Sequence, residues 1–324
     1  MLNPALRLAL HLPIAALMLV SANASADEPL VPGTGEFIAK VGDDFEDPNW
    51  GYKYNNPKNS QELDGEARNP GGFSTNGRWF EGPLRGQPDL LKRVPTPEGG
   101  LPGSEGSLLM RSLYTGTPGK PSGHSQQDDL IVNVRSRMGG LIPVGWLPSV
   151  VVRVYFPPFE EWENRTGNTF ALRLGMRGSR PNGEEEVEEY WPGMFVYFKS
   201  ENPRKGTPDS AYFIIRSDRS GRDFKGPDIV ETGWWTLGMS CTADGQVHYF
   251  ARPGIEDLTS ADHIYSQFPY GFRGRHFETF FFDLIGGDNG RTWSTNWIID
   301  DPSLYLARQP RAAPQTARKR SRRR

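Results

Sequence analysis

The densest group of residues able to do chemistry is a run of carboxylates, because five of the six positions from 184 to 189 are glutamate. Cleavage of a glycosidic bond commonly needs two carboxyl groups, one ionised and one protonated. The run therefore offers candidate carboxyl groups for this chemistry. The run also follows a turn-like Arg-Pro-Asn-Gly segment, so it fits equally a solvated acidic loop that leads into a strand beginning at Tyr190.

A second chemical feature is the supply of large aromatic side chains, since nine tryptophans occur in 324 residues. Aromatic faces bind sugar rings by stacking, and several of these residues stand in or beside predicted strands. Trp234 and Trp235 are adjacent on one strand and must point to opposite faces, so one is expected in the core and the other toward solvent or ligand. The candidate ligand-binding residues are Tyr190, Trp191, Trp234, Trp235, Trp293 and Trp297. The alternative is that most of these tryptophans belong to the core.

The composition excludes several other kinds of site. A single cysteine, Cys241, rules out an internal disulfide and a cysteine-based zinc site, and we expect it to be buried and inert. Five scattered histidines make a histidine-rich metal centre improbable. The sequence contains no phosphate-binding glycine loop after a strand, no nucleophile elbow and no His-Glu-x-x-His helix.

The elements that position these residues are predicted to be strands. Gly and Pro together account for 65 residues, a level that suits many short strands joined by tight turns. Segments that alternate apolar with polar or small residues include 149–156, 169–174, 194–198, 212–216, 277–285 and 297–306, with others at 107–111, 130–134, 234–241 and 247–250. The pattern predicts two stacked antiparallel sheets, with Val150–Phe156 as a central strand. One short helix is expected within 255–264. Residues 47–106 are loop-rich and either cross one face of the sandwich or form a small subdomain.

Three motifs resemble the concanavalin A-like lectin/glucanase superfamily, which includes laminin-G-like jelly rolls. They are the opening Asp43-Asp44-Phe45-Glu46-Asp47, the hairpin at Gly233–Phe250 with its Asp244-Gly245 turn, and the closing Trp297–Tyr305 with Asp300-Asp301. The resemblance implies an all-β jelly-roll sandwich of the concanavalin A-like type. It also implies a structural Ca²⁺ held by Asp44, Glu46 and Asp300, because calcium prefers carboxylate and carbonyl oxygens.

Two enzyme classes that occur on this fold have partial matches. Gly183–Tyr190 resembles the motif of family 16 glycoside hydrolases, which implies Glu184 as nucleophile, Glu186 as assisting acid and Glu189 as acid/base. The chain departs from that motif, since Glu186 replaces an aspartate and Glu185 stands at an apolar position. Polysaccharide lyases of this fold use Tyr or His with Arg to remove a proton beside a uronate, and residues of these types are His248, Tyr249, His276, Arg216, Arg273 and Arg275.

The two ends differ from the body in composition. Residues 1–26 read as a signal peptide, with Arg7 before an apolar stretch and Ala24-Ser25-Ala26 as a cleavage site, so we expect a periplasmic or extracellular protein. Residues 308–324 carry eight Lys or Arg and no acid, and are expected to form a disordered basic tail that binds an anionic envelope surface or simply stays solvated. Residues 27–307 are expected to form a single domain. Nine of the 37 basic residues lie outside this range, whereas all 39 acidic residues lie inside it, so the domain has a net charge of −11. An acidic body argues against a specific nucleic-acid partner.

These observations favour an exported β-sandwich protein that binds a polysaccharide or other glycan. The alternative is a polysaccharide-degrading enzyme, either a retaining glycoside hydrolase or, with less support, a lyase. A further alternative is a structural envelope protein tethered by its basic tail.

Overall fold

A computed structural model describes residues 28–66, 68–180, 186–202, 204 and 206–308. The predicted signal peptide and nearly all of the predicted basic tail lie outside these residues, as does Glu184. Within them, no helix is both long and apolar enough to cross a membrane.

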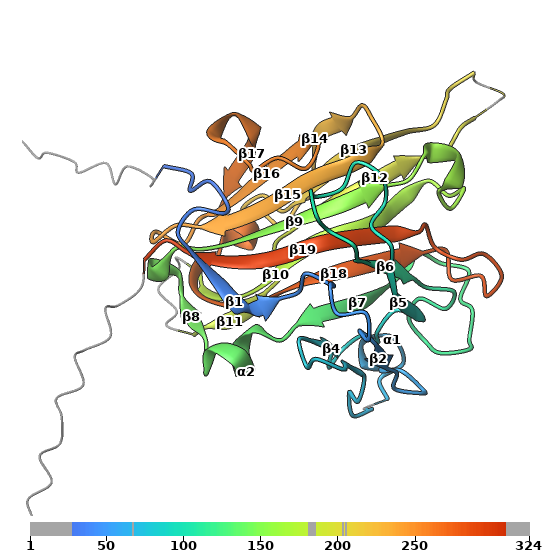
Figure 1. Ribbon diagram of the computed structural model, residues 1–324, viewed down its shortest axis with the longest axis horizontal. Coiled ribbons are helices and arrows are strands. Elements are labelled where there is room, and N and C mark those ends of the chain that lie inside the picture. Colours follow the sequence, from blue (N-terminus) through green and yellow to red (C-terminus); the bar gives the residue numbers. More distant parts are fainter. Residues whose placement is uncertain (1–27, 67, 181–185, 203, 205, 309–324) are drawn as a thin grey trace, which may run out of the picture.

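The chain forms two antiparallel sheets packed face to face, which confirms the predicted jelly-roll sandwich (Figure 1). The first sheet has the strand order β17 (His263–Gln267), β16 (Val247–Pro253), β15 (Gly233–Cys241), β9 (Pro148–Phe156), β19 (Trp297–Leu306), β6 (Ser107–Arg111) and β5 (Leu90–Val94), with β1 (Glu36–Gly42) on β19. The predicted strand at 150–156 is central, between β15 and β19.

The second sheet is the larger of the two and carries the site described below. Its order is β14 (Phe224–Ile229), β13 (Ser210–Arg216), β12 (Gly193–Lys199), β10 (Gly167–Ser179), β18 (Arg273–Gly286), β7 (Gln126–Val132), β4 (Trp79–Glu81), β3 (Phe73–Ser74) and β2 (Tyr52–Lys53), with β11 (Glu188–Tyr190) on β10 and β8 (Ile142–Pro143) on β18. The loop-rich segment 47–106 therefore extends the edges of both sheets.

Helical structure is brief. In the described residues the α-helices are α1 (Gln61–Asp64) and α2 (Val134–Met138), and the 3₁₀ turns are η1 (Val144–Trp146), η2 (Phe159–Glu161), η3 (Ser260–Asp262) and η4 (Pro269–Gly271). The short helix predicted within 255–264 is the single turn η3, after which the chain enters β17.

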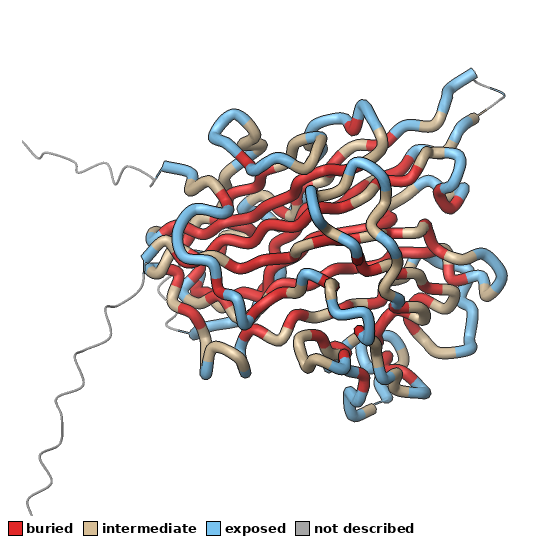
Figure 2. Tube along the Cα trace, viewed as in Figure 1, coloured by how far each residue is buried: buried red, intermediate tan, exposed pale blue. Residues whose placement is uncertain are grey.

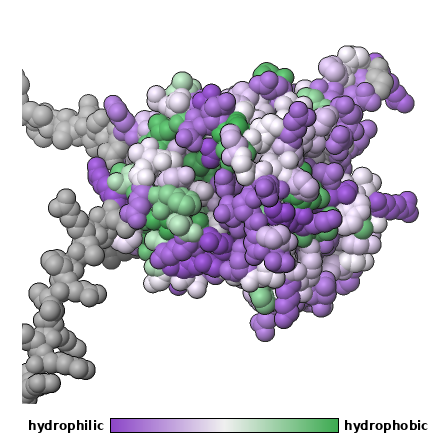
Figure 3. Space-filling model, viewed as in Figure 1, coloured by the Kyte–Doolittle hydropathy of each residue, from purple (hydrophilic) through white to green (hydrophobic). Residues whose placement is uncertain are grey.

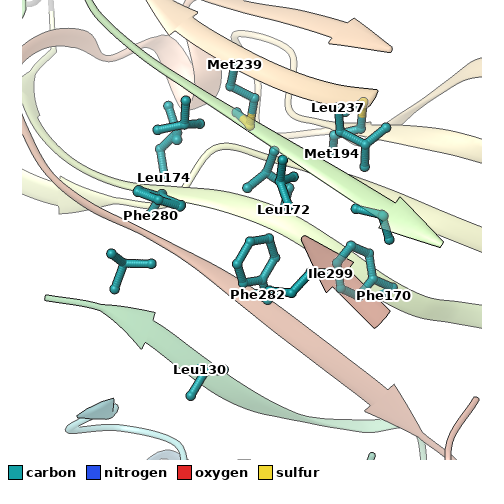
Figure 4. Close-up of a cluster of buried hydrophobic side chains, with 14 of the residues drawn as sticks. Leu130, Phe170, Leu172, Leu174, Met194, Leu237, Met239, Phe280, Phe282 and Ile299 are labelled. Atoms are coloured by element: carbon teal, nitrogen blue, oxygen red, sulfur yellow. The ribbon is translucent and has the colours of Figure 1, made fainter. Parts of the chain in front are cut away.

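The core lies between the sheets and is built by strand alternation. Leu172 and Leu174 of β10 and Phe280 and Phe282 of β18 point inward and meet residues of the first sheet such as Leu237 (Figure 4). Burial follows the strands, while the loops at both ends are exposed (Figure 2). Hydrophilic residues cover most of the face shown in Figure 3, with smaller hydrophobic patches among them. Because side chains alternate along a strand, the residues that lie between these inward-pointing ones on β10 and β18 point to the outer face of the second sheet.

The predicted hairpin joins β15 to β16 through Thr242–Gln246. Gly245 has φ +87°, and a Cβ there would lie 2.6 Å from the backbone of Gly274, so only glycine fits. Cys241 ends β15 and is fully buried, as expected, and burial raises the pKa of its thiol to about 12. A thiol with this pKa is protonated and unreactive at neutral pH.

Candidate functional site

A groove of about 620 Å³ lies on the outer face of the second sheet. Outward-facing residues of β10, β18 and β7 form its floor, and the segment 82–85 after β4 forms part of its wall. Its lining mixes arginines and carboxylates with Trp191, Phe281 and Ile131. A concave site with a few converging polar groups among apolar ones is the usual form of a ligand-binding site.

Arg173 of β10 is the central cation of the floor. Its Nη1 lies 3.2 Å from Asp283 Oδ2 and its Nη2 donates to the backbone oxygen of Trp191 at 2.9 Å. The guanidinium also packs over the rings of Phe195 and Phe281, at 5.5 and 5.3 Å. Arg173 is largely buried, and no partner for its Nε is found in the described part of the chain. Arginine suits this position because its planar group bonds and stacks at once.

Two carboxyl groups meet beside Arg173. Asp129 of β7 stands directly opposite Asp283 of β18 in the strand register, and the two lie within hydrogen-bond range of each other. Gln127 Nε2 donates to both, at 3.1 Å to Asp129 and 2.9 Å to Asp283. Burial raises the pKa of Asp129 well above its ordinary value, and the neighbouring Asp283 raises it further. Like-charged carboxyls at this separation hold a proton more tightly than an isolated one does.

The remaining charges of the groove are paired. Arg85 forms two bonds to Glu62, at 2.6 and 2.8 Å. Glu278 accepts from Arg177 and from Arg135, each at 2.8 Å. These pairs hold long side chains in fixed positions along the groove, which lowers the entropy lost when a ligand binds.

Aromatic rings provide the apolar part of the groove. Trp191 follows β11 directly, lies at the edge of the groove and is 37% exposed. On the other side, Arg216 of β13 lies 4.5 Å from the centroid of the Phe195 ring and is fixed by Asp223, with the shortest contact at 2.6 Å. Arg216 and Arg85 also line a second cavity of about 240 Å³, so the two hollows share a wall. The groove therefore offers a partly exposed tryptophan and fixed cations to a ligand.

The carboxylates predicted to be catalytic do not converge on one point in the described residues. Glu186 is exposed and precedes β11. Glu189 lies at the edge of the groove, where it pairs with Arg177. Because Glu184 lies outside the described residues, the geometry of the Glu184/Glu189 pair is not defined, and its catalytic role stays a prediction.

Four of the six residues predicted to form an aromatic binding face are buried. Tyr190, Trp234, Trp235 and Trp297 are 2%, 6%, 5% and 0% exposed. Trp235 stacks on Phe156 in the core, and Trp297 packs edge-to-face on the same ring. Trp234 does point to the opposite face from Trp235, but the loop at 97–100 covers it, and its Nε1 donates to Pro97 O at 3.3 Å. Trp293 is half-buried against Arg111, at 4.9 Å, and Trp191 alone among the six predicted residues lines the groove.

The residues considered for a lyase are also dispersed. His248 lies on the first sheet, is fully buried, and bonds to Thr242 and Ser266, at 2.8 and 2.6 Å. Burial lowers its pKa to about 4, so it stays neutral. Tyr249 is buried in the core, and of the predicted set Arg216 is the residue found in the groove.

The three predicted calcium ligands lie in one acidic corner where the segment after β1 meets β19. Burial and the neighbouring Asp301 and Glu46 raise the pKa of Asp300 to about 7, whereas a bond from Ser104 lowers it. Each carboxylate already accepts protein donors: Asp44 from Glu46 N, Glu46 from Gly106 N, and Asp300 from Ser104 Oγ. In the described residues, no three His, Cys, Asp or Glu side chains form a group able to hold a metal. A bound cation would relieve the repulsion between these carboxylates. Calcium binding in this corner stays a proposal.

Sequence reasoning missed Asp129 and Arg173, which line the groove, and Gln127 and Asp283, which bond to them. Arg173 and Asp283 each carry a signal, because a charged residue interrupts an apolar strand at an alternating position. A buried charge must be paired, so two such interruptions of opposite sign predict a contact. Which strands would lie side by side was not evident from the sequence.

No protein-family model matches the sequence, and comparison with curated proteins finds no match. Among solved structures, the chain is similar to the PL7 alginate lyase AlyA1 from Zobellia galactanivorans, with 12% identity, a TM-score of 0.36, and 65% of this chain and 82% of that one covered. It is similar to the endo-β-1,4-glucuronan lyase from Trichoderma reesei, with 11% identity, a TM-score of 0.35, and 67% and 87% covered. The carbohydrate recognition domain of Emp47p matches at 8% identity and a TM-score of 0.32, with 68% and 89% covered. At these identities and TM-scores the matches carry no argument about what this chain does.

Proposed function

We propose that this is an exported protein that binds an acidic polysaccharide in the groove on the outer face of its second sheet. The observation that carries the proposal is the groove itself, which is lined by Arg85, Arg173, Arg216 and the partly exposed Trp191. The export rests on the signal-like residues 1–26.

The chemistry of the lining supports a sugar polymer. The faces of sugar rings stack on aromatic side chains, and their hydroxyl groups bond to charged side chains held in place by their own partners. Arg85, Arg173 and Arg216 are each fixed by a carboxylate, so they can donate to a ligand with little loss of entropy.

The charge distribution supports an acidic ligand. The 27–307 body carries a net charge of −11 and would repel a polyanion at most of its surface. Arginines gathered in a concave site offset that repulsion locally, and a guanidinium binds a carboxylate through two parallel hydrogen bonds. An acidic chain would therefore bind at the groove rather than elsewhere on the body.

The test is titration of the full chain with soluble neutral and uronate-containing polysaccharides, followed by calorimetry and by tryptophan fluorescence. We expect saturable binding of a uronate-containing polymer that weakens with added salt. Equal or stronger binding of neutral polymers would contradict the acidic ligand, and no binding to any of them would overturn the proposal.

A further inference from the structure

The carboxyl pair at the base of the groove has no role in binding an acidic ligand, because a carboxylate repels one. Asp129 lines the groove, whereas Asp283 behind it is fully buried. Both accept from Gln127, and Asp283 also accepts from Arg173. The other three carboxylates that line the groove in the described part of the chain, Glu62, Glu189 and Glu278, are each held by an arginine.

We infer that Asp129 is the acid–base residue of an elimination reaction that cleaves a uronate-containing polysaccharide in this groove, with Asp283 and Gln127 as positioning residues. The inference rests on the proposed binding of an acidic polysaccharide and adds a reaction to it.

The spacing of the two carboxyls argues against hydrolysis by this pair. Retaining hydrolysis needs two carboxyls about 5–5.5 Å apart, and inverting hydrolysis about 6.5–9.5 Å, one on each side of the bond. Asp129 and Asp283 are instead close enough to hydrogen-bond to each other, and one of them is fully buried. Of this pair only Asp129 lines the groove, so a reaction that relies on the pair must use that one carboxyl group twice.

Elimination beside a carboxylate meets that requirement. Ionised Asp129 takes the proton from C5 of a uronate, the C5–H electron pair forms the C4=C5 double bond, and the C4–O4 bond breaks. The same carboxyl then gives its proton to the departing O4, which becomes the hydroxyl group of the released sugar. No water, oxidant or cofactor is consumed, and Asp129 returns to its starting state.

The neighbours of Asp129 suit this chemistry. Three charged groups face it: Asp283 from β18, Arg173 from β10 and Arg85 from the segment after β4. Proton removal beside a carboxylate requires neutralisation of the uronate charge, and Arg173 and Arg85 are the cations nearest to do so. The raised pKa of Asp129 makes its ionised form a stronger base than an ordinary aspartate.

The experiment incubates the full chain with polyglucuronate, polymannuronate, polyguluronate and polygalacturonate. Ultraviolet absorbance follows the conjugated double bond, and mass spectrometry separates elimination products from products that contain added water. We expect unsaturated products from at least one polymer, and a 10²–10⁴-fold lower rate for Asp129→Asn. Asp257→Asn, which changes an exposed aspartate that pairs with Arg153 on the other sheet, is the matched control and should keep the full rate.

The pH profile provides a readout that loss of stability would not produce. The rate should rise with pH as Asp129 ionises, and Asp283→Asn should move that rise to lower pH, because removing the neighbouring charge lowers the pKa of Asp129. If Asp129→Asn fails to fold, the pH profile of Asp283→Asn still tests the role of the carboxyl pair.

The outcomes separate the inference from the proposed function. Binding without unsaturated product from any of the four polymers overturns the reaction and leaves the binding site. Product formed equally well by Asp129→Asn, or an unmoved pH profile in Asp283→Asn, overturns the role of the pair. Absence of binding overturns the proposed function and the reaction with it.

Discussion

At the residue scale, the groove depends on the shape of Arg173 as well as its charge. The guanidinium donates to Asp283 and to the backbone oxygen of Trp191, and it also packs over two aromatic rings. A lysine would keep the charge but lacks the planar, forked group that makes both hydrogen bonds while it packs on the rings. The backbone bond to Trp191 also links the floor of the groove to its exposed edge.

Trp191 provides the most direct test of binding at this edge. Trp191→Ala removes an exposed ring, while the backbone oxygen that accepts from Arg173 stays in place. We expect the affinity for polysaccharide to fall by about 1–2 kcal/mol, roughly fivefold to thirtyfold, with little change in Tm. Calorimetric titration measures the affinity, and differential scanning calorimetry the Tm.

The control is Trp293→Ala, which removes a ring that packs on Arg111 and does not line the groove. It should leave the affinity unchanged. If Trp293→Ala weakens binding more than Trp191→Ala does, the polysaccharide binds elsewhere.

Asp300 should make the stability of the fold depend on pH. Its pKa rises from the ordinary 3.8 to about 7 on folding, so between these values the folded state binds more protons than the unfolded chain. Its contribution is fully present below about pH 4 and is lost as pH rises through 7, with a loss of up to about 4 kcal/mol. Urea denaturation at pH 4.5, 6 and 8 should show a smaller fall in stability for Asp300→Asn than for the unchanged protein. An identical fall in both would contradict this role.

If calcium binds in the acidic corner, it should reverse the loss of stability that accompanies ionisation of Asp300 at higher pH. A bound cation favours the ionised form of Asp300 and relieves its repulsion with Glu46. We expect millimolar calcium to raise the Tm of the unchanged protein at pH 8, and to have a smaller effect on Asp300→Asn and Glu46→Gln. No change of Tm in the unchanged protein would remove calcium from this corner.

At the element scale, the strands were predictable and the groove was not. The alternating pattern places the strands at 107–111 and 297–306 with the bounds that the structure shows, because one buried face imposes a period of two. The groove floor joins β7, β10 and β18, whose segments are far apart in the sequence, and alternation does not reveal which strands become neighbours. The burial of Trp234 was missed for a similar reason, since its covering loop at 97–100 is distant in the sequence.

The buried Lys58 connects the wall of the groove to the second sheet. Its Nζ lies 2.5 Å from Asp128 of β7 and 2.9 Å from Asp89, and both Lys58 and Asp128 are almost fully buried. Lys58 stands three residues before α1, which carries Glu62, the partner of Arg85. This network therefore holds the part of the wall that positions Arg85.

Lys58→Met should leave Asp128 without its cation and lower the free energy of unfolding by about 3 kcal/mol. It should also weaken polysaccharide binding, because the wall segment loses its attachment. Urea denaturation measures the first effect and titration the second. Lys53→Met removes an exposed lysine from the same region and should cost far less. Equal costs for the two variants would show that the buried pair contributes nothing net.

At the scale of the whole molecule, two separate features can attract anions. The groove offers fixed arginines within an acidic body, whereas residues 308–324 supply eight Lys or Arg and no acid. Binding at the groove needs a polymer that fits, but attraction by a basic tail needs only a dense negative surface, and it falls steeply with salt as counterions are released. The two features should therefore be separable by truncation and by ionic strength.

The full chain should bind vesicles that contain anionic lipid at low salt, and a chain ending at residue 307 should not. Each basic residue near such a surface contributes up to about 1 kcal/mol, so eight are sufficient for attachment that half-molar salt abolishes. The affinity of the groove for polysaccharide should be the same in both forms, because the groove residues all lie before residue 308. Co-sedimentation measures the first property and titration the second. Equal vesicle binding by both forms would remove the tail as an anchor, and lost polysaccharide binding on truncation would place that activity in the tail rather than the groove.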